Sequence, residues 1–117
     1  MITQTLNQVK NILFLHHNFP GQFRFIAKHL DKTRYSVKFL YETNYYGSIA
    51  GVEEIQVRID DDLANASLDG QIRCGNRYKK MFEELQKTQW IPDYIISHSG
   101  WGCGLHSKAV FPNAKLI

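Results

Sequence analysis

A short apolar run that breaks at a Pro-Gly turn and leads directly into a helical pattern constrains this chain more than any other stretch. Residues 12–15 (Ile-Leu-Phe-Leu) are continuously apolar, which is typical of a buried parallel strand and too short for a helix. Pro20 and Gly21 then mark a turn. After the turn, apolar residues recur at the spacing of one helical stripe: Phe23, Ile26, Ala27 and Leu30. Such a strand–turn–helix sequence is the opening half of a βαβ unit.

The rest of the chain continues this alternation of strands and helices. Strands are expected at about 10–17, 35–41, 54–59 and 93–97, and a fifth begins at 115–117. Helices are expected at about 20–31, from Ser67 or Asp69 to about Gln89, and in a short segment that ends before Pro112. The buried stripe of the long helix is expected to be Cys74, Tyr78, Met81, Phe82 and Leu85. The pattern predicts an α/β fold, a Rossmann-like parallel sheet with flanking helices. Right-handed crossovers give the strand order 3-2-1-4-5, with the chain stopping inside the fifth strand.

The reversal of strand order between the first and fourth strands predicts a binding crevice at the carboxyl ends of these strands. Two loops would face it. The loop after the first strand carries His16, His17, Asn18, Pro20, Gly21 and Gln22, and the loop after the fourth carries His98, Ser99, Gly100, Trp101, Gly102 and Gly104.

These residue types suit a polyhydroxylated ligand or a phosphate better than an apolar ligand. Glycines let backbone amides approach a ligand, and the amides that open the first and last helices could hold an anionic group. Trp101 and Phe19 offer flat apolar faces, while Asn18, Gln22 and the histidines offer hydrogen bonds. The alternative is that glycine and proline after a strand serve only as turn residues.

Composition narrows the classes of function. The chain has 117 residues, enough for one domain, and a formal net charge of +3 with its 14 basic residues spread along the sequence. This distribution does not predict a nucleic-acid surface. No apolar run approaches the roughly 20 residues of a membrane helix, and residues 1–9 lack the features of a signal peptide. Cys74 and Cys103 are therefore expected to be reduced thiols of a cytoplasmic protein.

Other constellations have less support in the sequence. A zinc site can be drawn from several residues, although no pair has a familiar ligand spacing: His16, His17, His98, Cys103 and His106. Cys103 beside a histidine could be a nucleophile, but a packed thiol is the simpler interpretation. Ser99 does not lie in a Gly-x-Ser-x-Gly elbow, and no dinucleotide or P-loop motif occurs. Residues 60–62 (Asp-Asp-Asp) could hold a divalent ion, or form a solvated acidic loop. Arg73, Arg77 and Lys80 share a helical face that is expected to be solvated.

Two passages, read in order along nearly the whole chain, resemble a known family. The first is residues 12–23, which contains the string His-x-Asn-Phe-Pro-Gly-Gln-Phe. The second is residues 92–102, which contains His-x-Gly-Trp-Gly and is followed by 111–117. Both resemble the amino-terminal part of bacterial glycosyltransferase family 4 proteins.

The resemblance implies a partial amino-terminal, acceptor-side Rossmann-like domain of a two-domain GT-B enzyme, spanning residues 1–117. Such enzymes are retaining transferases, hexosyltransferases among them, that move a sugar from a nucleotide-sugar to an acceptor hydroxyl on a glycan or lipid-linked acceptor. By this resemblance His98 contacts the reacting sugar, and Pro20, Gly21 and Gln22 belong to the loop that faces the donor phosphates. No metal or other cofactor is implied.

The nucleotide-binding carboxyl-terminal domain of that family has no counterpart in the sequence. We therefore expect an excised piece of a longer protein that is inactive alone and self-associates through its open sheet edge. Two alternatives remain at this stage. One is a stand-alone α/β ligand-binding module without catalysis, and the other is a small metalloprotein built on the histidines.

Overall fold

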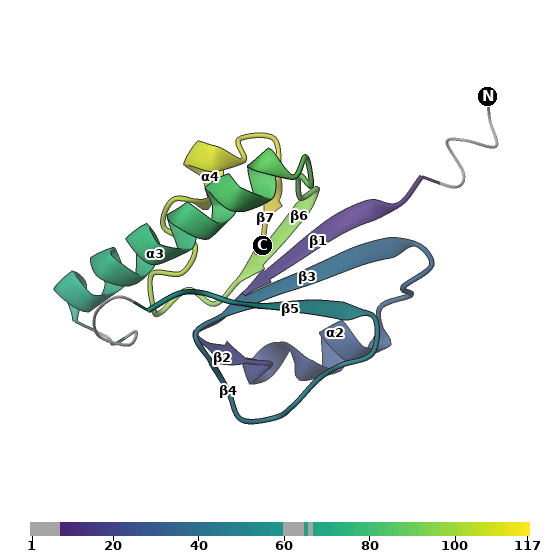
Figure 1. Cartoon of the computed structure of the whole chain (residues 1–117), viewed down its shortest axis with the longest axis horizontal. Coiled ribbons are helices and arrows are strands. Elements are labelled where there is room, and N and C mark those ends of the chain that lie inside the picture. Colours follow the sequence, from purple (N-terminus) through teal and green to yellow (C-terminus); the bar gives the residue numbers. More distant parts are fainter. Residues whose placement is uncertain (1–7, 60–64, 66) are drawn as a thin grey trace.

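A parallel sheet with helices on both faces forms the body of the protein (Figure 1). It is seen in a computed structural model that describes residues 8–59, 65 and 67–117. In chain order the elements are β1 (Lys10–Leu15), β2 (Asn18–Phe19), the 3-10 turn η1 (Gly21–Phe23), α2 (Arg24–His29), β3 (Tyr35–Tyr41), β4 (Thr43–Asn44), β5 (Val52–Gln56), α3 (Leu68–Lys87), β6 (Tyr94–Ser97), α4 (Ser107–Val110) and β7 (Lys115–Leu116). No helix among these described residues is long and apolar enough to cross a membrane.

The five-stranded sheet has the order β5-β3-β1-β6-β7, and every neighbouring pair is parallel. The unbroken apolar run therefore occupies the central strand, β1, where both faces are covered. This arrangement confirms the predicted fold class and the predicted position of the first strand between the second and the fourth.

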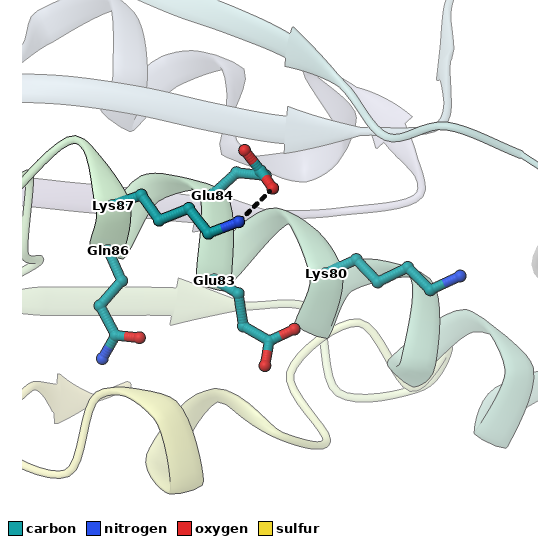
Figure 2. Close-up of a pocket in the computed structure, with 5 residues that line it drawn as sticks. All are labelled: Lys80, Glu83, Glu84, Gln86 and Lys87. Carbon is teal, nitrogen blue, oxygen red and sulfur yellow. Dashed lines mark hydrogen bonds and ion pairs between the residues drawn. The ribbon is translucent and has the colours of Figure 1, made fainter.

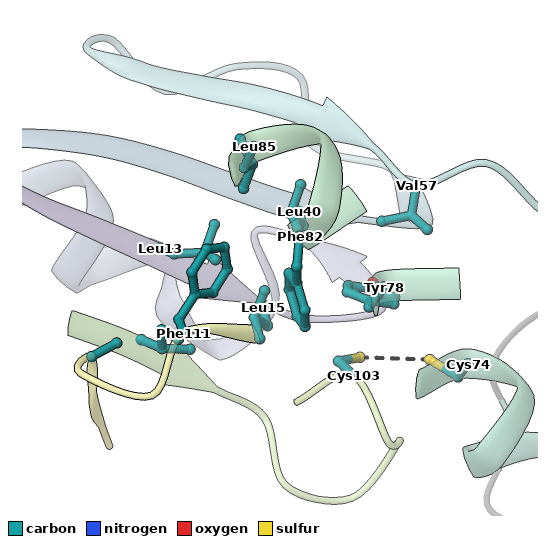
Figure 3. Packing of buried hydrophobic residues seen from close by; sticks show 12 residues of the cluster. Leu13, Leu15, Leu40, Val57, Cys74, Tyr78, Phe82, Leu85, Cys103 and Phe111 are labelled. Atoms are coloured by element: carbon teal, nitrogen blue, oxygen red, sulfur yellow. Dashed lines mark hydrogen bonds between the residues drawn. The ribbon is translucent and has the colours of Figure 1, made fainter. Parts of the chain in front are cut away.

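Alternation along β1 divides the core into two layers. Leu13 and Leu15 face α3, where they pack with Tyr78, Phe82 and other residues of the larger cluster (Figure 3). Ile12 and Phe14 face the opposite side and pack against the smaller cluster, which includes Phe23, Ala27 and Phe39. Since successive side chains of a strand point to opposite faces, one apolar segment serves both layers.

The long helix α3 covers one face of the sheet, and its start follows the sequence signal. Ser67 is the N-cap, with its side-chain oxygen accepting the backbone N–H of Gly70 at 3.0 Å. Its buried stripe contains the predicted Cys74, Tyr78, Phe82 and Leu85. The helix ends just before Gln89, whose φ of 66° lies in the left-handed region.

Several expected boundaries are corrected by the structure. The first helical segment is shorter than predicted, because it opens with the 3-10 turn and ends at His29; Ile26 is 47% exposed rather than buried. The third strand lies at Val52–Gln56. A two-stranded parallel sheet of β2 and β4 was not predicted. Residues 60–62, where an acidic ion site was considered, lie outside the described part of the chain.

Candidate functional site

The loops that follow β1 and β6 lie side by side, as the strand order requires. Leu15 and Ser97 end these two strands as register partners, so the next residues emerge at the same edge of the sheet. The rings of His16 and His98 have centroids 4.6 Å apart, and the ring of His17 lies 4.3 Å from that of Trp101. Four predicted site residues are thus in ring contact across the crevice. We call His16, His17, His98 and Trp101 the ring cluster.

His16 forms the floor of the ring cluster. Its side chain is only 5% exposed, and its ring stacks on that of His17 with centroids 4.6 Å apart. Burial, followed by the neighbouring charges of His17 and His98, lowers the pKa of His16 to about 4. His16 is therefore neutral at physiological pH.

The other two histidines are partly exposed at the mouth. Burial, followed by the neighbouring charge of His98, also lowers the pKa of His17. The Nδ1 atom of His98 accepts the backbone N–H of Gly100 at 3.2 Å. The same pattern occurs at His16, whose Nδ1 accepts the backbone N–H of Asn18 at 3.0 Å. Two backbone turns of the same kind therefore orient two of the three rings.

The remaining predicted site residues occupy different positions around the cluster. Pro20 is buried, whereas Gly21, Gln22 and Ser99 are exposed. Gly21 has a φ of 56°, and a Cβ atom at this position would lie 2.5 Å from Nε2 of His16. Only glycine therefore lets the loop pass so closely over the ring.

The amino termini of the first and last helices, which were predicted to hold an anion, are less suited to this than the sequence suggested. The segment after Gly21 begins as a 3-10 turn before a six-residue helix, and α4 has four residues. Helices this short have few aligned peptide dipoles. Polar contacts in this crevice must come mainly from side chains and loop amides.

A cavity of about 390 Å³ adjoins the ring cluster on the β6–β7 side. The predicted residues His98, Ser99 and Gly102 line it, together with Gln71 of α3 and Leu116 of β7. A second hollow lies elsewhere, on the exposed face of α3 (Figure 2). Its five lining side chains all come from that helix, where Lys87 pairs with Glu84 at 3.3 Å. This second surface is a solvated helix face, and only the first cavity contains predicted site residues.

A buried polar layer beneath the ring cluster was missed by the sequence analysis. Glu42, which is 0% exposed, follows β3 and pairs with Arg77 of α3, with Nε and Oε2 2.8 Å apart. The Tyr78 hydroxyl donates to the backbone carbonyl of His16 at 2.8 Å. The prediction that Arg77 lies on a solvated face is wrong, because its side chain is only 5% exposed. A glutamate directly after a buried strand was the available signal, since such a carboxylate needs a cation.

The five-residue zinc constellation does not assemble. Cys103 is buried against Cys74, and His106 hydrogen-bonds Asn76 through its Nε2 at 3.0 Å. A ring nitrogen from each of His16, His17 and His98 does lie within 4.8 Å of one from each of the other two. Among the described residues this triad is the remaining candidate for a metal site, although Nδ1 of His16 and Nδ1 of His98 already accept backbone N–H groups.

Together, the parallel sheet and the ring cluster between the loops at its switch point define a Rossmann-like α/β domain. A family model described as "Glycosyl transferase family 4 group" matches residues 34–117. The chain therefore belongs to the glycosyl transferase family 4 group, which supports a glycosyltransferase-type function in general. No curated protein and no solved structure matches the chain.

Proposed function

We propose that this chain is the acceptor-side domain of a glycosyltransferase that moves a sugar from a nucleotide-sugar donor to an acceptor hydroxyl. The observation that carries the proposal is the ring cluster at the β1–β6 switch point, in a chain of this family. Hydrogen-bonding rings, a tryptophan face and the adjoining cavity suit a sugar, which combines hydroxyl groups with apolar C–H faces.

His98 has the central role in this proposal. Its Nδ1 is engaged by Gly100, so its Nε2–H is the group that remains to donate to a sugar oxygen. A hydrogen bond from this group to a sugar hydroxyl would hold the sugar in the position required for transfer. The protein supplies positioning and electrostatic stabilisation in this scheme. No nucleophile is assigned.

The test is sugar transfer by the longer enzyme of which we propose this chain to be a part. His98→Ala should lower kcat/KM on the order of 100-fold, the scale for loss of a hydrogen bond made in the transition state. His29→Ala is the matched control, because His29 lies on the exposed side of α2, where its ring contacts Phe25. Equal losses in the two variants would remove His98 from the site.

A second experiment addresses the chain alone. The isolated 117-residue chain is expected to transfer no sugar from any nucleotide-sugar, because the donor-binding half of the proposed enzyme is not part of it. Clear turnover by this chain would contradict the half-site proposal.

A further inference from the structure

A hydroxyl group on β4 is connected to the ring cluster through one asparagine side chain. The two-stranded sheet of β2 and β4 sets Asn18 and Thr43 beside each other as register partners. The Thr43 hydroxyl donates to Oδ1 of Asn18, and the amide nitrogen of Asn18 lies 3.3 Å from Nε2 of His17. A chain of side-chain hydrogen bonds therefore runs from β4 through β2 to a histidine of the ring cluster.

The backbone fixes the direction of these hydrogen bonds. The carbonyl of His17 accepts the N–H of Glu42 at 3.0 Å and the N–H of Thr43 at 2.9 Å, which occupies both of its lone pairs. The Thr43 hydroxyl lies 3.4 Å from the same carbonyl, so Oδ1 of Asn18 is the acceptor that remains for its proton. The amide nitrogen of Asn18 then faces His17 as a donor, and Nε2 of His17 accepts. Because burial keeps the pKa of His17 below 6.5, the ring is neutral at pH 7.5 and its single proton lies on Nδ1.

Ring packing alone would not select this proton position. The ring of His17 contacts those of His16 and Trp101, with centroids 4.6 Å and 4.3 Å away. Such contacts restrain the tilt of a ring without distinguishing its two nitrogens, whereas the hydrogen bond from Asn18 does distinguish them. The selected Nδ1–H is buried and has no hydrogen-bond partner among the described residues. An unpaired buried donor destabilises the free protein, and a substrate oxygen that entered the ring cluster would remove this penalty.

We propose that Thr43 and Asn18 are positioning residues, which act through His17 and make it a hydrogen-bond donor inside the ring cluster. The hydroxyl orients the amide, and the amide sets the proton position of the ring. The sequence predicts Asn18 as a direct ligand contact, whereas here its amide is used within the protein. The inference rests on the proposed function only for its last step, in which an oxygen of the substrate accepts the N–H of His17.

Nitrogen-15 NMR of the imidazole rings tests the proton position directly, in the full 117-residue chain near pH 7.5. The parent protein should show the Nδ1–H tautomer at His17. Asn18→Asp keeps an acceptor for the Thr43 hydroxyl but places a carboxylate oxygen where the amide donated, so the proton should move to Nε2 of His17. An Nε2–H tautomer in the parent, or an unchanged Nδ1–H tautomer in Asn18→Asp, would overturn the proposal. The parent spectrum alone can do so, and the test therefore does not depend on the folding of a variant.

Two variants of Thr43 have opposite expected outcomes. Thr43→Val keeps the β-branched shape that suits β4 but removes the hydroxyl, so Asn18 is free to turn and His17 should show a mixture of both tautomers. Thr43→Ser keeps the hydroxyl and should keep the Nδ1–H tautomer. Thr88→Val is the matched control, because it removes a hydroxyl that donates to the carbonyl of Leu85 at 2.7 Å, at the end of α3. It should leave the signals of His17 unchanged, and equal changes in Thr43→Val and Thr88→Val would overturn the proposal.

Sugar transfer by the longer enzyme separates this inference from the proposed function. Thr43→Val should lower kcat/KM about tenfold, the scale of one hydrogen bond, and Thr43→Ser should restore it to within about twofold. Normal transfer by Thr43→Val, with the tautomer of His17 disturbed as expected, would overturn the positioning role in the reaction and leave the proposed function. The expected tautomers in an enzyme whose transfer does not depend on His98 would remove the proposed role of His98 and leave Thr43 and Asn18 as the residues that position His17.

Discussion

The Sγ atoms of Cys74 and Cys103 lie 3.8 Å apart, and neither side chain is exposed (Figure 3). This contact joins α3 to the loop after β6, directly behind the ring cluster. The hydrogen bond with Cys103, together with burial, raises the pKa of the Cys74 thiol. A thiol reacts as its thiolate, so this pair is built for packing rather than for chemistry.

The first prediction concerns thiol reactivity. In the folded protein near pH 8, a disulfide reagent such as DTNB should label neither cysteine on the timescale of minutes. Both should react at once in 6 M guanidinium, on the scale of free thiols. Labelling of the folded protein at the rate of the unfolded protein would contradict the burial of the two thiols.

The second prediction is an acid-dependent loss of stability caused by His16. Its folded-state pKa is lowered from 6.5 to about 4, so between these values the unfolded chain binds a proton that the folded chain does not. The contribution of neutral His16 to the free energy of unfolding is fully present above pH 6.5. It should decline as the pH falls toward 4, by up to about 1.4 kcal/mol per pH unit. Chemical unfolding at a series of pH values measures this slope.

Two variants isolate this contribution. His16→Gln removes the ionisable ring and should flatten the slope between pH 6.5 and 4. His29→Gln removes an exposed histidine from α2 and should keep the slope of the parent protein. An unchanged slope in His16→Gln would assign the acid sensitivity to other groups.

The third prediction concerns the buried pair of Glu42 and Arg77. Glu42→Gln removes the carboxylate that pairs with the buried Arg77 guanidinium and should lower the free energy of unfolding by about 3–5 kcal/mol. The double variant Glu42→Leu/Arg77→Met removes both charges and should lose less than the single variant. Urea unfolding at pH 7 compares them, and a double variant that is the less stable of the two would refute this account.

The fourth prediction tests the close approach between Gly102 and α3. Gly102 has a φ of 83°, and a Cβ atom there would clash with the backbone carbonyl oxygen of Gln71. Gly102→Ala should lower the free energy of unfolding by about 2–5 kcal/mol, because it adds left-handed backbone strain and steric overlap. Gly47→Ala is the control: its φ of 113° is also positive, but nothing lies within 4 Å of the added atom. Gly47→Ala should lower the free energy of unfolding by about 1–2 kcal/mol. An equal loss in the two variants would show that the clash at Gly102 has no effect on stability.

Much of the architecture could be predicted because local signals and topology agreed. The apolar run at 12–15, the Ser67 cap and the stripe of α3 each specified an element without knowledge of its neighbours. Connection rules then placed β1 between β3 and β6, and so brought His16 beside His98. Adjacency of the two loops followed from strand order alone.

What could not be predicted depends on contacts between distant segments. The environment of Arg77 is set by Glu42, which is 35 positions away in the sequence, so helical periodicity alone placed this side chain in solvent. The hydrogen bonds that orient the histidine rings were equally inaccessible. They depend on the backbone path through Asn18 and Gly100, which the residue types do not specify.

The bond from Tyr78 to the carbonyl of His16 has a mechanical consequence. α3 supports the first loop through this hydroxyl, and it meets the second loop at Gln71, where Gly102 rests against the helix backbone. The helix α3 therefore contacts both loops that carry the ring cluster. The spacing of the two loops is tied to the part of α3 between residues 71 and 78. While both contacts are in place, the two loops are coupled through α3, and a displacement of this helix would move them together.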